Sequence, residues 1–139
     1  MSHFTKLEKA NIVSQDAFLA ACEELGLNEV IKNTTIKDYF GNSSKVDVAV
    51  KVGSYHIGLV KNDAGTYDMI ADWWGVRGSQ LRGKLKEALG SSYSEEDIQD
   101  CMLRYTTKHT ITKKYKKMGF RINVQEDENK SLIVNMTRF

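Results

Sequence analysis

Two apolar segments on either side of a short turn constrain the fold of this chain more than any other feature. Residues 55–60 and 67–74 each alternate apolar with polar or small side chains, which predicts two strands with one buried face. The apolar residues of the two strands lie on the same face only if the residue numbers of each directly opposed pair add up to an even number. A pairing of Asn62 with Thr66 satisfies this condition. The three-residue loop between them ends at Gly65, where such loops need a left-handed backbone. The sequence therefore predicts a hairpin with a fixed register.

Two further segments have the pattern of strands. Residues 46–52 place four valines at alternate positions, which predicts that one face is buried by Val46, Val48, Val50 and Val52. Residues 120–124 and 132–139, joined by a polar connection, predict a terminal hairpin. The residues expected to face inward on that hairpin are Phe120, Ile122, Val124, Leu132, Val134 and Met136.

One helix is expected before the strand segments of residues 46–74, and another is expected after them. Ser14 can cap the first helix, which ends before Gly26. Its apolar face consists of Phe18, Ala21, Cys22 and Leu25. Ser79 is expected to cap a short helix that ends at Gly90 and has leucines on its apolar face.

A third, longer helix is expected near the end of the chain. Ser94 followed by Asp97 resembles a capping box, and Gly119 marks the end of the helix. The β-branched residues near His109 have poor helix propensity, but we expect one unbroken helix. The resulting order, β-α-β-β-β-β-α-α-β-β, predicts an α+β fold with an antiparallel sheet and helices packed on one face. Residues 1–139 are expected to form a single domain.

The composition excludes several classes of protein. No apolar run approaches the ~18 residues that cross a bilayer, and the N-terminal segment lacks the apolar core of a signal peptide. We therefore expect no membrane contact. Cys22 and Cys101 fall on expected apolar helix faces, and His3, His56 and His109 are scattered along the chain. Neither a disulfide framework nor a metal site is predicted, and no cofactor is expected.

The two tryptophans are adjacent, and a strand sends adjacent side chains to opposite faces. With the hairpin register above, Trp73 is expected in the core. The face opposite the core is expected to carry His56, Gly58, Asp68, Ile70, Asp72 and Trp74, with Arg77 just beyond. His56 would lie directly across from Asp72. Whether helices cover Trp74 on this face is left open by the sequence, and an uncovered Trp74 beside charged groups has the composition of a binding hot spot.

The expected pair of His56 and Asp72 has two interpretations. A carboxylate beside an imidazole orients the ring and stabilises its protonated form, as in a general base. We therefore expect Asp72 to raise the pKa of His56, with burial acting in the opposite direction. Cross-strand polar pairs also stabilise sheets without catalysis, by roughly 0.2–1 kcal/mol. No serine or cysteine stands at an identifiable nucleophile position beside the pair, so a structural or ligand-contacting role is favoured and no catalytic residue is assigned.

Positive charge is concentrated in the second half of the chain. Residues 71–139 contain thirteen Lys and Arg against nine Asp and Glu, and residues 101–125 contain no acidic residue. The basic residues that a nucleic-acid surface would use are Arg82, Lys84, Lys86, Lys113, Lys114, Lys116 and Lys117. Lysines at the C-terminal end of a helix that begins with acidic residues also suit the helix dipole. This second interpretation is favoured, and nucleic-acid binding remains the alternative.

Three segments together resemble one family: "MSHF" at the start, "YHIGLVKNDAGTYDMIADWWGV" in the middle and "RYTTKHTITKKYKKMGF" near the end. The chain is similar to the hypothetical chloroplast reading frame thirty-five family, a domain of unknown function found in plastid genomes, cyanobacteria and some of their phages. The tryptophan pair after the glycine-marked hairpin is the most specific element. The resemblance implies a small soluble protein of a phototroph or its virus, and it supplies no activity and no catalytic residues. The segment "TTKHTITKK" is richer in lysine than the family leads one to expect, which leaves the basic-surface alternative open.

The leading hypothesis is a non-enzymatic binding or adaptor protein. Its surface for a protein partner would include His56, Asp72, Trp74, Arg77 and the helix that follows. One alternative is nucleic-acid binding through the basic helix faces, and another is an enzyme with a His–Asp general base. The resemblance places the protein in the cytoplasm of a cyanobacterial or phage-infected cell, or in the plastid stroma.

Overall fold

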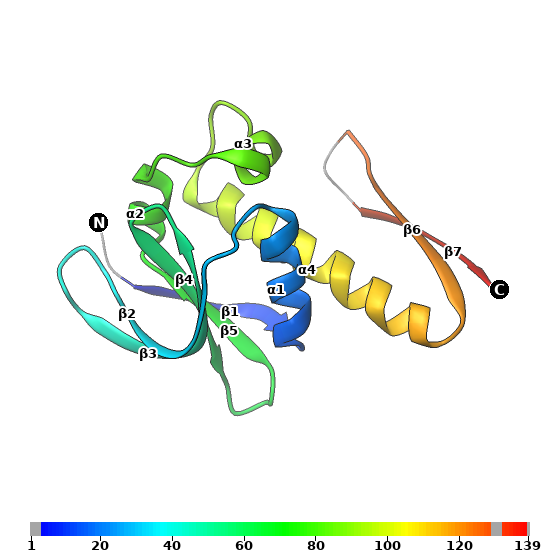
Figure 1. Ribbon diagram of the computed structural model, residues 1–139, viewed down its shortest axis with the longest axis horizontal. Coiled ribbons are helices and arrows are strands. Elements are labelled where there is room, and N and C mark those ends of the chain that lie inside the picture. Colours follow the sequence, from blue (N-terminus) through cyan, green and yellow to red (C-terminus); the bar gives the residue numbers. More distant parts are fainter. Residues whose placement is uncertain (1–3, 129–131, 139) are drawn as a thin grey trace.

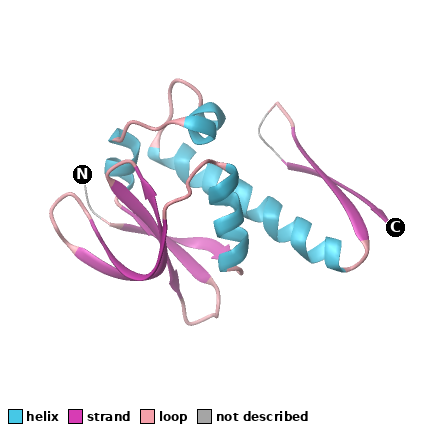
Figure 2. Ribbon diagram, viewed as in Figure 1, coloured by secondary structure: helices cyan, strands magenta, loops and turns pink. Residues whose placement is uncertain are grey.

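A five-stranded antiparallel sheet forms one end of the molecule (Figures 1 and 2). The computed structural model describes residues 4–128 and 132–138 of the chain. The strands of this sheet are β1 (Thr5–Ile12), β2 (Val30–Lys37), β3 (Ser43–Val52), β4 (Tyr55–Lys61) and β5 (Tyr67–Ala71). They lie in the order β1-β5-β4-β3-β2, and each neighbouring pair is antiparallel.

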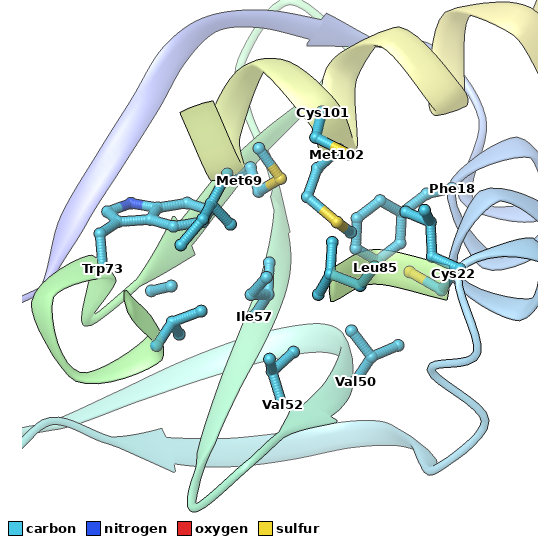
Figure 3. Packing of buried hydrophobic residues seen from close by; sticks show 14 of the residues in the cluster. Phe18, Cys22, Val50, Val52, Ile57, Met69, Trp73, Leu85, Cys101 and Met102 are labelled. Atoms are coloured by element: carbon cyan, nitrogen blue, oxygen red, sulfur yellow. The ribbon is translucent and has the colours of Figure 1, made fainter. Parts of the chain in front are cut away.

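Helices cover one face of this sheet, and the α+β fold expected from the sequence is confirmed. The helices are α1 (Gln15–Glu24), α2 (Trp73–Gly78), α3 (Gly83–Leu89) and α4 (Glu95–Lys117). In Figure 3, Phe18 of α1, Leu85 of α3 and Met102 of α4 gather above Val50 and Ile57 of the sheet, and all five side chains are buried. The order of elements agrees with the prediction except that α2 is an additional helix.

The register of the β4–β5 hairpin is the predicted one. The N–H of Asn62 donates to the carbonyl oxygen of Thr66 at 2.9 Å, and Ile57 is paired with Ala71. Gly65 has a φ of 82°, the left-handed conformation that the loop needs. Turn chemistry and the matching of apolar faces therefore determine this hairpin together.

The strand β5 ends earlier than predicted, at Ala71, and the tryptophans begin α2 instead. Asp72 causes the change, because its side chain accepts a hydrogen bond from the N–H of Gly75 at 3.0 Å and so caps the helix. Trp73 is 1% exposed and Trp74 is 45% exposed, so their predicted inward and outward placement is confirmed. The two side chains point in different directions because successive residues of a helix are rotated about its axis, and not because side chains alternate along a strand.

The start and stop signals of α1 and α4 are confirmed. The Ser14 hydroxyl accepts a hydrogen bond from the N–H of Ala17, and both hydrogen bonds of the capping box between Ser94 and Asp97 are present. α4 continues without a break through His109 to its last residue. Because the helical hydrogen bonds and the packed face are continuous there, the low propensity of the threonines does not end the helix.

The predicted role of Ser79 is wrong. Its N–H donates to the carbonyl oxygens of Gly75 and Val76, so Ser79 ends α2 and does not begin α3. Arg82 stands at the start of α3 and its side chain makes no capping hydrogen bond. Gly90 ends α3 as predicted, with a φ of 83°.

The sheet also buries apolar residues on the face away from the helices. This second cluster consists of Ile36, Val46, Ala49 and Ile70. Val46 therefore does not share a face with the other three valines of β3, contrary to the prediction. Gly58 makes room for it, since a Cβ atom on Gly58 would lie 2.6 Å from Cγ1 of Val46. Gly58, Asp68 and Ile70 are all buried, so this face is less polar than the sequence pattern suggested.

The terminal hairpin forms a separate two-stranded sheet of β6 (Phe120–Glu126) and β7 (Leu132–Arg138). It lies against the C-terminal half of α4 (Figure 1), where the rings of Tyr115 and Phe120 are 6.2 Å apart. Four of the residues predicted to face inward, Phe120, Ile122, Val124 and Val134, are half-buried. Met136 is 46% exposed, contrary to the prediction, because one helix is too narrow to cover the hairpin. The side chain of Leu132 lies outside the described residues. No helix in the described part of the chain is long and apolar enough to cross a membrane.

Candidate functional site

Trp74 lines a hollow of about 470 Å³ beside α2 and the connection between α3 and α4. The lining residues are Trp74, Arg77, Gly78, Lys86, Ser91, Ser92 and Tyr93. Two of them are cations, two are aromatic and three have hydroxyl groups, whereas none is acidic. We call this site the cationic hollow. The structure thus brings Trp74 and Arg77 of the predicted binding surface together with Lys86, which the sequence assigned to a nucleic-acid surface.

Tyr93 holds both cations of the cationic hollow. Its carbonyl oxygen accepts a hydrogen bond from Nε of Arg77 at 3.2 Å, and its ring lies 5.1 Å from Nζ of Lys86. The second distance is within the range of a cation–π contact. Within the described residues, no carboxylate lies at ion-pair distance from either cation. The positive charges of the hollow are therefore positioned by neutral groups and left unneutralised.

Exposed aromatic rings adjoin the cationic hollow. Tyr39 is 62% exposed and Phe40 is 66% exposed, and both lie in the loop between β2 and β3. The ring of Tyr39 is 5.3 Å from that of Phe40 and 6.0 Å from that of Trp74, with edge-to-face geometry in both contacts. We call these three residues the aromatic patch. Because Trp74 also lines the hollow, the two features form one continuous surface.

Buried carboxylates hold the loop that presents the aromatic patch. Asp72, which is 1% exposed, accepts a hydrogen bond from the N–H of Tyr39 through its second oxygen at 2.9 Å. Asp38 accepts hydrogen bonds from the N–H and the side-chain amide of Asn42, at 2.8 and 3.0 Å. Since the Oδ1 atom of Asp72 caps α2, one carboxylate fixes Trp74 and Tyr39 relative to each other. The predicted site residue Asp72 is therefore buried beneath the surface and positions its exposed residues.

The predicted pair of His56 and Asp72 does not form. Neither ring nitrogen of His56 hydrogen-bonds to Asp72, and its partner in β3 is Lys51. Burial and the charge of Lys51 lower the pKa of His56, and the opposing effect of Glu29 is weaker. The hairpin register is nevertheless the predicted one. The pair does not form because the chain leaves the sheet after Ala71 and turns into α2. His56 lies outside the cationic hollow and the aromatic patch, and the expected increase of its pKa is wrong.

The carboxylate of Asp72 acts on a different residue. Burial, followed by the charge of Asp72, raises the pKa of the Tyr55 hydroxyl. Tyr55 packs against α2, where a Cβ atom on Gly75 would lie 2.5 Å from its ring. Tyr55 and His56 are successive residues of β4 and point to opposite faces, so Asp72 acts on the neighbour of His56 and not on His56 itself.

The two basic groups predicted for nucleic-acid binding do not lie on one surface. Lys84 and Lys86 belong to α3, and Arg82 directly precedes it, beside the N-terminal part of α4. Lys113, Lys114, Lys116 and Lys117 lie at the C-terminal end of α4 (Figure 1). The helix has 23 residues and is therefore roughly 35 Å long. Lys113 lies 3.3 Å from a carboxylate oxygen of Asp16, and Lys114 lies over the ring of Tyr115.

A second charged cluster connects α1 to α4. The carboxylate oxygens of Glu24 lie 2.5 Å from Nζ of Lys108 and 2.6 Å from Nε2 of His109. Burial acts to raise the pKa of Glu24, but the hydrogen bonds to Lys108 and His109 outweigh it and leave the pKa below its usual value. These contacts are between helices in the body of the molecule, so we assign the cluster a structural role.

The cysteines and the acidic side chains do not indicate a metal centre. Cys22 and Cys101 are free and buried, and burial raises the pKa of the Cys22 thiol to about 12. Across the described ranges, no three His, Cys, Asp or Glu side chains are grouped as metal ligands.

Sequence reasoning missed Tyr39, Phe40 and Tyr93. One local signal was present, because the adjacent aromatics Tyr39 and Phe40 precede Gly41 and Asn42, a typical turn sequence. Large apolar side chains in a turn have no strand or helix to bury them. The contact of this turn with α2 spans 33 residues of sequence and leaves no local pattern.

Comparison with known proteins places the chain in a family. Neither curated proteins nor solved structures give a match to this chain. The family described as "Protein of unknown function (DUF1257)" matches residues 21–133, which include the loop of the aromatic patch, the tryptophan pair and the whole cationic hollow. Since this match covers most of the sequence, the chain belongs to the DUF1257 family.

Proposed function

We propose that this protein is a non-enzymatic binding protein that recognises a partner protein through the aromatic patch and the adjoining cationic hollow. The observation that carries the proposal is the contact of three exposed aromatic rings, Tyr39, Phe40 and Trp74. Aromatic side chains dominate the energy of protein interfaces, and a cluster of them on a monomer surface has a cost in water that a partner removes.

The way in which the patch is held also supports recognition of a partner. Asp72 holds both the loop and α2, and Asp38 holds the loop, through buried or partly buried hydrogen bonds, so the rings lose little conformational freedom on binding. Preorganisation of this kind lowers the entropic cost of association. The cations Arg77 and Lys86 beside the patch favour a partner whose contacting segment is negatively charged.

The biological setting belongs to the proposal as well. The segments around the tryptophan pair and the C-terminal helix resemble proteins of plastids, cyanobacteria and their phages. The partner is accordingly a protein of a phototroph, and the complex forms in the cytoplasm of a cyanobacterial or infected cell or in the plastid stroma.

The proposal is tested by capture of partners from a phototroph lysate. Wild-type protein is compared with Trp74→Ala and with Ile133→Ala, a control on β7 with nearly the same exposure as Trp74, at 44%. We expect one or more partners to be captured by wild type and by the control but lost with Trp74→Ala. The captured partner is then purified and its affinity measured by calorimetry, where Trp74→Ala is expected to weaken binding by ten- to a hundredfold. Equal affinity of all three proteins would refute the proposed surface.

A further inference from the structure

We propose that the cationic hollow binds a phosphate monoester carried by a side chain of the partner protein. This inference rests on the proposed function and specifies the chemistry that the hollow recognises. Arg77 and Lys86 are the charged ligands, and Ser91 and Ser92, which also line the hollow, have hydroxyl groups that can donate hydrogen bonds.

Charge complementarity favours a phosphate over a carboxylate. The lining contains two cations and no acidic residue. A phosphate monoester has a charge of about −1.5 to −2 at neutral pH and three acceptor oxygens, whereas a carboxylate has a charge of −1 and two oxygens. Only the phosphate neutralises both cations and offers enough acceptors for the guanidinium, the ammonium and a hydroxyl group.

The cations are already placed for this task. The hydrogen bond from Nε of Arg77 to the Tyr93 carbonyl leaves the terminal nitrogens of the guanidinium free of hydrogen bonds within the described residues. Those nitrogens form the fork that binds phosphate oxygens in pairs. Lys86 approaches from α3 and rests on the Tyr93 ring. Tyr93 is therefore a positioning residue, since it orients both charges without supplying a charge of its own.

The shape of the hollow also fits a phosphorylated side chain. Its volume of about 470 Å³ exceeds what a single phosphate needs and has space for the atoms that connect the phosphate to a peptide. Trp74 forms one wall and continues into the aromatic patch, so a peptide with its phosphate in the hollow would have its neighbouring residues on Tyr39 and Phe40.

Direct binding is tested by NMR titration of the purified protein with O-phosphoserine, inorganic phosphate and glutamate. We expect shift changes at the Trp74 indole, the Arg77 Nε–H and the amides of Ser91 and Ser92 with the two phosphates, and much weaker ones with glutamate. Arg77→Gln and Lys86→Gln should each weaken binding on the order of tenfold or more, because each removes a charge-assisted contact. Lys84→Gln is the matched control, since Lys84 belongs to α3 but does not line the hollow.

Tyr93 has its own pair of variants. Tyr93→Phe keeps the ring and the carbonyl group and should bind O-phosphoserine like wild type. Tyr93→Ala removes the ring beneath Lys86 and should weaken binding several-fold. Absence of localised shifts with either phosphate, or equal effects of Lys84→Gln and Lys86→Gln, would overturn the inference.

Phosphatase treatment of the lysate separates this inference from the proposed function. If the partner is captured from untreated lysate but not from phosphatase-treated lysate, the ligand is a phosphorylated side chain and not free phosphate. Capture that survives treatment but is lost with Trp74→Ala would overturn the inference and leave the proposed function in place. Binding of O-phosphoserine together with normal capture by Trp74→Ala would refute the proposed function instead.

Discussion

Around the N-terminal end of α4, two cations face one hollow, whereas around its C-terminal end four lysines spread outwards from a single helix. The first two, Arg77 and Lys86, come from different helices and meet at Tyr93, and no carboxylate of the described residues lies within ion-pair distance of them. Of the four lysines, Lys113 is paired with Asp16 and Lys114 lies over Tyr115. The C-terminal end has more positive charge, but the N-terminal end has charges that converge on a concave surface beside exposed aromatic rings. Convergence and preorganisation, more than the number of charges, distinguish the candidate site.

The largest effect is expected from Asp72→Ala, because this residue supports the N-terminal region from within. The substitution leaves the N–H groups of Gly75, in a buried hydrogen bond, and of Tyr39, in a partly buried one, without their acceptor. We expect a loss of about 2–4 kcal/mol in the free energy of unfolding, measured by denaturant titration. Asp72→Asn keeps one acceptor and should lose less. A loss below 1 kcal/mol, on the order of a surface substitution, would show that the carboxylate does not hold the site together.

A comparison of two glycines in α2 is expected to have the next largest effect. A Cβ atom on Gly75 would lie 2.5 Å from the Tyr55 ring, whereas a Cβ atom on Gly78 would have no neighbour within 4 Å. Gly75→Ala should therefore destabilise the protein by about 1–3 kcal/mol through overpacking. Gly78→Ala should be neutral or slightly stabilising, since alanine favours the helix. Thermal unfolding of the two variants measures the difference, and equal melting temperatures would contradict the close packing of α2 on β4.

The contact between α1 and α4 gives a smaller, pH-dependent effect. The pKa of Glu24 is lower in the folded than in the unfolded protein, so its contribution to stability is present above the unfolded pKa and disappears as the pH falls through the folded one. Glu24→Gln should cost up to about 1 kcal/mol at neutral pH, because the carboxylate is partly exposed. The difference from wild type should vanish in acid. Denaturant unfolding at several pH values measures it, and a difference that grows with acidity would contradict the assignment.

Much of the fold could be predicted because its signals are local. The loop ending at Gly65 and the matching of apolar faces determined the β4–β5 register, and the pair Ser94 and Asp97 located the start of α4. Each signal depends on residues a few positions apart, where backbone geometry leaves few alternatives. The predicted strand and helix patterns therefore agree with the structure at most elements.

The end of β5 was mispredicted because two local signals overlap there. Asp72 continues the polar–apolar alternation of a strand, and the same residue type is a strong helix cap. Sequence alone cannot decide between them, because the same aspartate satisfies both patterns, and the hydrogen bond from the distant Tyr39 that also holds its carboxylate leaves no local signal. The candidate site depends on the same long-range contact and on the meeting of Arg77 with Tyr93. For this reason, Trp74 and Arg77 were predicted as binding residues, whereas Tyr39, Phe40 and Tyr93 were not.

The smallest effect on stability is expected from charge reversal at the C-terminal end of α4, which tests the comparison of the two ends directly. Lys113→Glu combined with Lys117→Glu should change the free energy of unfolding by no more than about 1 kcal/mol, because exposed ion pairs contribute little. Capture of the partner should be unchanged, whereas Arg77→Glu combined with Lys86→Glu should abolish it.

The same two double variants are titrated with a DNA oligonucleotide at low and raised salt. A surface that binds nucleic acid loses affinity steeply as salt increases, since each contacted phosphate releases a counterion. We expect weak binding by wild type with little salt dependence, and no difference for the C-terminal double variant. A steep salt dependence that disappears only in that variant would reverse the comparison and assign the ligand surface to the four lysines.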